Sequence, residues 1–172
     1  MVNVTIDENI PLPKSRRSGR SAKIKGATGE REIARLFIEC MERVERQHYG
    51  AAFDGMLSGS RLPSQHVKRN TLQSDRGGCD LAGVPLLAVE VKRVETLNVP
   101  AWWQQCVRQA EQLGLMPVLV YRQSRKIWQV RTWMKLSCVD GNVTRWVIAE
   151  TDIVSFLGWY QDLYARHLKM TQ

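Results

Sequence analysis

The sequence predicts one α/β domain in which helices flank a mixed central β-sheet, with elements in the order αβββαβ. Amphipathic helix patterns occur near the start, middle and end of the chain, and short apolar runs typical of strands lie between them. The chain has 172 residues, 44% of them hydrophobic, which suffices for one domain with its own core. We therefore expect a single folded unit at residues 26–172.

Residues 1–25 differ from the rest in composition. They contain six basic and two acidic side chains, two prolines and several serines, so we expect a flexible basic arm. The arm either contacts DNA phosphates or is a solvated tail that only aids solubility. Its candidate DNA contacts are Arg16, Arg17, Arg20, Lys23 and Lys25.

The first helix is predicted to begin at Gly26, because apolar side chains then recur every three or four positions. Glu30 falls at the edge of this apolar stripe, whereas Glu32 falls on the side expected to face water. Glu30 is therefore a candidate functional carboxylate. Alternatively, it is an ordinary first-turn charge that the helix dipole favours.

The later elements follow from apolar periodicity, turn residues and helix-end signals. Residues 50–79 are polar and basic, and we expect loops there around a weak strand at 65–72. The remaining predicted elements are strands at 86–94, 117–122, 126–133 and 145–149, with helices at 99–115 and from near Asp152 onward.

Six tryptophans lie in these predicted elements. Trp102 and Trp103 are adjacent on a helix, so one ring must point away from the buried side, as is typical of a dimer contact. The others are expected in the core, namely Trp128, Trp133, Trp146 and Trp159.

Strand 86–94 carries a charged pair on an otherwise apolar run. Side chains alternate along a strand, so Glu90 and Lys92 share a face, roughly 6.6 Å apart. The pair lies either on the solvent face of an edge strand or in an active site. Asp80 precedes Glu90 by ten residues, and the short connection allows both acids to meet and share Mg²⁺. Lys92 would then stabilise charge on the bound phosphate or orient the attacking water.

Three motifs resemble those of a known nuclease superfamily. CD at residues 79–80 and EVK at 90–92 resemble the core motif of PD-(D/E)XK nucleases, with Cys79 in the place of a proline. KGATGEREIARLF at 25–37 is similar to the opening of archaeal-type Holliday junction resolvases, and QCVRQAEQLGLMPVLVYR to the helix and strand after their catalytic strand. The resemblance covers residues 25–122 and implies a restriction-endonuclease-like core.

The resemblance also implies site residues. Asp80, Glu90 and the Val91 carbonyl would bind Mg²⁺ or Mn²⁺, with Glu30 as a further ligand, and Lys92 would serve catalysis.

A glutamine on the following helix faces the site in such resolvases. Gln105 and Gln109 lie one turn apart, so either can face the site or water. We assign Gln109 to catalysis and Gln105 to DNA binding. The remaining candidate DNA contacts are Lys68, Arg69, Ser74 and Arg76.

The formal charge of +8 and the pI near 9.6 favour a polyanionic partner such as DNA. The resemblance implies a metal-dependent endonuclease that acts on branched DNA such as four-way junctions. We expect it to be a homodimer, because junction resolution needs two symmetric cuts. The alternatives are a repair, recombination or restriction-type nuclease, or a non-catalytic DNA-binding module.

The four cysteines show no zinc-ligand spacing, and no signal peptide or membrane span is evident, so we expect a cytoplasmic protein with no membrane partner.

Overall fold

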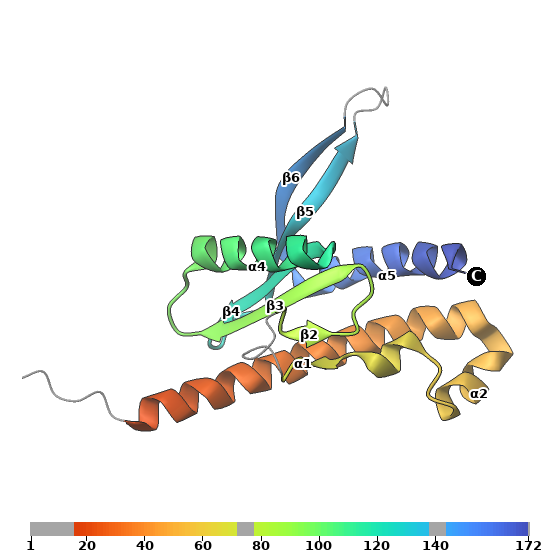
Figure 1. The fold of residues 1–172 in the computed structure, drawn as a ribbon, viewed down its shortest axis with the longest axis horizontal. Coiled ribbons are helices and arrows are strands. Elements are labelled where there is room, and N and C mark those ends of the chain that lie inside the picture. The colour runs from red at the N-terminus through yellow and green to blue at the C-terminus, as the bar shows by residue number, and fades with distance from the viewer. Residues whose placement is uncertain (1–15, 72–77, 138–143, 172) are drawn as a thin grey trace, which may run out of the picture.

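The computed structural model describes residues 16–71, 78–137 and 144–171. Its main sheet has four strands in the order β3-β4-β5-β6, of which β3 and β4 are parallel and the other neighbours antiparallel. The strands are β3 (Leu87–Val94), β4 (Met116–Gln123), β5 (Gln129–Ser137) and β6 (Thr144–Asp152). The long helices are α1 (Arg16–Tyr49), α4 (Val99–Leu113) and α5 (Ile153–Met170). This arrangement confirms the predicted mixed sheet flanked by helices (Figure 1).

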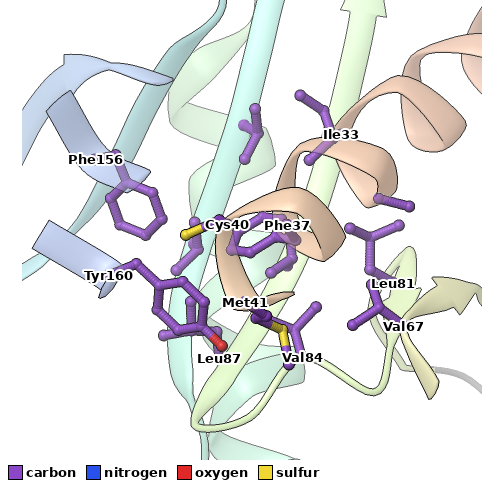
Figure 2. Packing of buried hydrophobic residues seen from close by; sticks show 14 of the residues in the cluster. Ile33, Phe37, Cys40, Met41, Val67, Leu81, Val84, Leu87, Phe156 and Tyr160 are labelled. Atoms are coloured by element: carbon purple, nitrogen blue, oxygen red, sulfur yellow. The ribbon is translucent and has the colours of Figure 1, made fainter. Parts of the chain in front are cut away.

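The helices cover the two faces of the sheet unequally. The larger core lies between the sheet and the pair α1 and α5, where Phe37 meets Tyr160 edge to face at 5.3 Å between ring centroids. Figure 2 shows this packing, with Ile33 and Met41 of α1 beside residues of the sheet and of α5. Helix α4 covers the opposite face through a smaller cluster around Trp103 and Leu119. Successive side chains along β3 and β4 therefore point alternately into the larger core and toward α4.

The segment between α1 and β3 is more ordered than the sequence suggested. It contains η1 (Gly50–Ala52), α2 (Phe53–Ser58), η2 (Pro63–His66), β1 (Lys68–Arg69) and β2 (Leu81–Ala82). The expected strand at 65–72 is only two residues long and pairs with β2 alone. Phe53 and Leu62 are buried, and this burial explains why short helices form in a segment rich in loop-forming residues.

A single glycine sets the turn between β2 and β3. Gly83 has a φ of +80°, and an added Cβ would lie 2.3 Å from the carbonyl oxygen of His66. Only glycine fits both the left-handed backbone and this close approach. The turn leads directly from the segment that holds Asp80 into the strand that holds Glu90.

Helix α1 begins at Arg16, ten residues before the predicted start at Gly26. No proline interrupts the segment, and Lys25 is held by an ion pair of 2.7 Å with Glu95 after β3. Residues 1–15 lie outside the described part of the chain. The role of residues 1–25 as a DNA-contacting arm remains a prediction.

The tryptophans only partly follow the expectation. Trp128 and Trp103 are buried, while Trp102 packs partly buried against the same cluster as Trp103. Trp146 is 62% exposed, so the expectation that it lies in the core is wrong. The reason is geometric: β4 pairs with β5 only up to Thr132, whereas β5 and β6 continue together to Ser137. Helix α4 makes its main sheet contacts with β3 and β4, so it leaves Trp146 of that extension uncovered.

A buried carboxylate joins three parts of the fold. Glu45 of α1 has no exposed surface and accepts hydrogen bonds from the backbone N–H of Ser64 at 2.9 Å and the hydroxyl of Tyr164 at 2.7 Å. The Ser64 hydroxyl also donates to it. Because every donor is buried, each would lose its only replacement for water if the carboxylate were removed.

We expect Glu45→Ala to lower the free energy of unfolding by about 3 kcal/mol, because it leaves buried donors unpaired and opens a cavity. Glu42→Ala, about one helical turn before Glu45 at a partly exposed position, should lower the free energy of unfolding far less. Urea unfolding followed by circular dichroism measures both. Equal losses in the two variants would contradict a structural role for Glu45.

Candidate active site

The candidate site is built around Glu90, in the middle of β3. The side chains of Leu87, Val89 and Val91 enter the core under α1, and Glu90 and Lys92 point to the other face, as the alternation predicted. β3 is an edge strand of the main sheet, but Glu90 has no exposed surface. The solvent-face interpretation of Glu90 is therefore wrong, since a buried charge requires partners.

Two side chains hold one oxygen of Glu90. The ammonium of Lys92 lies 2.5 Å from Glu90 Oε1, and the amide of Gln105 on α4 donates to the same oxygen at 3.0 Å. Lys92 itself remains partly exposed, with 23% of its side chain accessible. The ammonium thus links the buried carboxylate to the surface of the protein.

Asp80 meets β3 beside Glu90, as the short connection predicted. Its Oδ2 accepts a hydrogen bond of 2.7 Å from the backbone N–H of Val91. The carbonyl of Asp80 accepts from the N–H of Asn70 at 2.8 Å, so the β1–β2 pair fixes the backbone here. Asp80 is 6% exposed. Two carboxylates therefore converge on one point of β3.

Negative charges lie close together in the site. Burial and the neighbouring charge of Asp80 raise the pKa of Glu90 to about 7, although Lys92 acts in the opposite direction. Burial alone would lower the pKa of Lys92, but the carboxylates of Glu90, Asp80 and Glu30 raise it above its usual value. Three acids act on one lysine, so the cluster has more negative than positive charge to stabilise.

Glu30 approaches this cluster from α1. Its Oε2 accepts from Arg69 Nε at 2.5 Å, and its side chain is 16% exposed. The helix can come close because residue 29 is a glycine. A Cβ on Gly29 would lie 3.2 Å from both Arg93 Cβ and the ring of Trp128. Gly29 thereby sets the distance between α1 and the end of β3.

The helical phase predicted that Glu32 faces water, but its carboxylate is bound by two side chains of the protein. It accepts hydrogen bonds of 2.8 Å from both Trp128 Nε1 and Arg122. The guanidinium of Arg122 in turn stacks over the Trp128 ring at 4.3 Å. The chain between β4 and β5 lies against this side of α1, and the sequence pattern of α1 alone does not reveal that neighbour. Glu32 is therefore a packing residue of the α1–sheet contact.

The other predicted residues differ in their surroundings. Gln105, rather than Gln109, contacts Glu90, and within the described part of the chain Gln109 Oε1 is buried without a hydrogen-bond partner. Arg69 pairs with Glu30, a contact that the sequence did not suggest. Lys23, Lys25 and Lys68 are exposed. Ser74 and Arg76 lie outside the described residues, and so do the side chains of Arg16, Arg17 and Arg20.

The donor types suit a hard divalent cation. In the described part of the chain, no three histidine, cysteine, aspartate or glutamate side chains are arranged to hold a metal ion by themselves. Mg²⁺, however, needs only one or two carboxylates when waters and phosphate oxygens complete its shell. Asp80 and Glu90 supply those carboxylates, and their mutual repulsion is what a cation between them would relieve. The residues present therefore fit such an ion.

Comparison with known families decides the class of protein. The family described as "Phage putative PDDEXK endonuclease" matches residues 21–154, which include every element of this cluster. The chain belongs to this family. The protein is thus a nuclease. Asp80, Glu90 and Lys92 all lie inside the matched region of this PDDEXK endonuclease. No curated protein and no solved structure matches the chain.

No helix in the described part of this PDDEXK endonuclease is long and apolar enough to cross a membrane.

We expect Gly29→Val to lower the free energy of unfolding by about 2 kcal/mol, because its side chain would displace Arg93 and Trp128 in a closely packed contact. Gly158→Val on α5 is the matched control, since a Cβ there meets nothing within 4 Å. Chemical unfolding of both variants measures the difference. If the two glycines tolerate valine equally, α1 does not depend on Gly29 for its position.

Proposed function

We propose that this nuclease is a divalent-metal-dependent endonuclease, using Mg²⁺ or Mn²⁺, that hydrolyses phosphodiester bonds of branched DNA such as four-way junctions. The observation that carries the chemistry is the buried Glu90 carboxylate beside Asp80, with Lys92 bound to it at 2.5 Å. Two acids and an amine that meet beside β3 are the groups that metal-assisted phosphate hydrolysis needs.

The proposed ligands are the carboxylates of Asp80 and Glu90 and the carbonyl of Val91. The resemblance implies Glu30 as a further ligand, and it would have to leave its ion pair with Arg69 to reach the ion. A bound Mg²⁺ would polarise the scissile phosphate and neutralise charge on the leaving oxygen. The N–H of Val91 fixes the orientation of Asp80, and the amide of Gln105 fixes that of Glu90.

The partly exposed ammonium of Lys92 is the group that would reach the reacting phosphate. It can donate a hydrogen bond to a phosphate oxygen or orient the attacking water while Glu90 holds its other side. Gln105 replaces Gln109 as the glutamine of the site in this proposal, because only Gln105 contacts Glu90.

DNA as substrate is supported by the family and by the net charge of +8. The preference for branched DNA is supported by the similarity of residues 25–37 and 105–122 to archaeal-type Holliday junction resolvases. Two symmetric cuts across a junction would require a two-fold dimer. Exposed lysines near the site, such as Lys68 and Lys25, are suited to phosphate contacts.

We expect Asp80→Asn and Glu90→Gln each to reduce Mg²⁺-dependent cleavage to background while DNA binding is retained or strengthened, because each change removes metal affinity and repulsion of phosphate together. Labelled four-way junction, fork, duplex and single strand, each with and without Mg²⁺, are the substrates. Glu39→Gln, an exposed acid of α1, is the control.

Cleavage by both site variants at the wild-type rate would refute the site. Cleavage of linear duplex at the rate of the junction would retain the nuclease site and refute the preference for branched DNA.

We expect Glu30→Gln to slow single-turnover cleavage by about 100-fold or more, because it weakens one ligand of the proposed metal site. Glu32→Gln should instead lower the free energy of unfolding, since Glu32 bonds Trp128 and Arg122. Its cleavage rate per folded molecule should stay near that of the wild type. The reverse pattern would exchange the roles of the two acids.

A further inference from the structure

Strands β5 and β6 form a two-stranded ribbon that extends past the rest of the sheet. We call residues 133–137 of β5 with residues 144–148 of β6 the β-ribbon. β4 pairs with β5 only as far as Thr132, while the β5–β6 pairs continue to Ser137. Figure 1 shows these two strands rising clear of the helices and of β3 and β4. The β-ribbon therefore lacks a neighbouring strand on the side where β4 would lie.

The β-ribbon exposes large apolar side chains. Leu136 is 51% exposed, Trp146 is 62% exposed and Ile148 is 55% exposed. Ile148 pairs with Trp133 and Trp146 with Lys135, so the two exposed residues of β6 share one face. A cavity of about 330 Å³ lies beside Trp146 and is also lined by Trp159 and Leu163 of α5. Leu136 pairs with Arg145 and so lies on the opposite face from Trp146 and Ile148. Contiguous exposed apolar side chains such as Trp146 and Ile148 often mark protein interaction sites.

The outer edge of β6 is uncharged in its middle, between the exposed side chains of Arg145 and Glu150. β6 is the last strand of its sheet, and its register with β5 is unbroken from Gln129 to Ser137. Residues 146–149 form an uncharged run without proline. Edge strands are normally blocked by charges, prolines or bulges, so a regular, apolar edge of this kind is suited to the addition of another strand.

We propose that two copies of this chain pair through β6, antiparallel and about a two-fold axis at Val147, so that their sheets join into one. A two-fold axis normal to a sheet keeps each residue on its own face and must pass through a residue position. At Val147 it sets Trp146 opposite Ile148 of the partner subunit, and this apolar pair occurs twice.

The neighbouring register is less favourable. An axis at Ile148 would place Trp146 against Glu150 of the partner subunit. Glu150 is already bound within its own chain by Tyr121 at 3.1 Å and Arg131 at 2.7 Å. The axis at Val147 therefore covers more apolar surface than the axis at Ile148 and leaves the ion pair of Glu150 in place, so we favour it over that register.

A second copy fits this surface better than DNA does. The β-ribbon has two exposed basic residues, Lys135 and Arg145, but its uncharged run at 146–149 supplies none of the Lys and Arg contacts on which DNA binding depends. The β-ribbon also extends beyond the amino-terminal ends of β3 and β4, because β5 runs antiparallel to β4. Lys92 lies in the carboxyl-terminal half of β3. Pairing through β6 thus leaves both candidate sites open to substrate. That such a dimer would make two symmetric cuts in one DNA molecule rests on the proposed function.

The first test is the mass of the particle in solution. Sedimentation equilibrium should give a dimer for the wild type and a monomer for the double variant Trp146→Lys, Ile148→Lys. Val154→Lys, at a residue that is 75% exposed outside the β-ribbon, should remain dimeric. A monomeric wild type across the micromolar range would overturn the proposal. A dimer that survives the double substitution would also overturn it. If the wild type is a monomer and the double variant binds DNA more weakly, this surface contacts DNA and the proposal is wrong.

The second test fixes the register and does not depend on a destabilising change. In a Cys138→Ser background, Val147→Cys should form a disulfide-linked dimer, because paired Cα atoms lie about 4.5 to 5.5 Å apart at the axis. Ala149→Cys is the control, since its two copies would be roughly 14 Å apart. Cross-linking equal at both positions, or absent at 147, would overturn the register. Mass and cross-linking are read without DNA cleavage, so failure of the proposed function would be seen separately.

Discussion

The carboxylate of Glu90 is completely buried on β3, the first strand of the main sheet. Removing a charge from water costs several kcal/mol unless hydrogen bonds and opposite charge replace the lost solvation. Lys92 and Gln105 provide that replacement, one from the same strand and one from α4. Asp80 opposes it, because a second carboxylate nearby raises the pKa of Glu90. The protein thus maintains an arrangement that a purely structural strand would not need.

Other parts of the fold hold this arrangement in place. Small residues at the contact between β3 and α4, Ala88 and Ala110, let the helix lie close enough for Gln105 to reach Glu90. Gly83 allows the turn that returns the chain from Asp80 to β3, and Gly29 allows α1 to approach with Glu30. The site therefore depends on small residues at three contacts: β3 with α4, the turn after β2, and α1 with the end of β3. A larger side chain at any of them would move a functional group relative to Glu90.

The sequence predicted the parts of the site that follow from local periodicity. Alternation along β3 correctly placed Glu90 and Lys92 on one face, and the short connection correctly brought Asp80 to them. Contacts between distant elements were not predictable in this way. The pairing of Arg69 with Glu30, the hydrogen bond of Trp128 to Glu32 and the choice of Gln105 over Gln109 depend on how helices sit on the sheet. The exposure of Trp146 depends on where β4 ends relative to β5, which hydrophobicity alone does not encode.

Calorimetric titration of Mn²⁺ into the protein, without DNA, tests the central claim that Glu90 and Asp80 form a cation site. The account predicts saturable binding to the wild type and to Glu39→Gln. The double variant Asp80→Asn, Glu90→Gln should show no binding while its circular dichroism spectrum stays that of the wild type. Equal Mn²⁺ affinity in the double variant and the wild type would show that the ion binds elsewhere and would contradict the account.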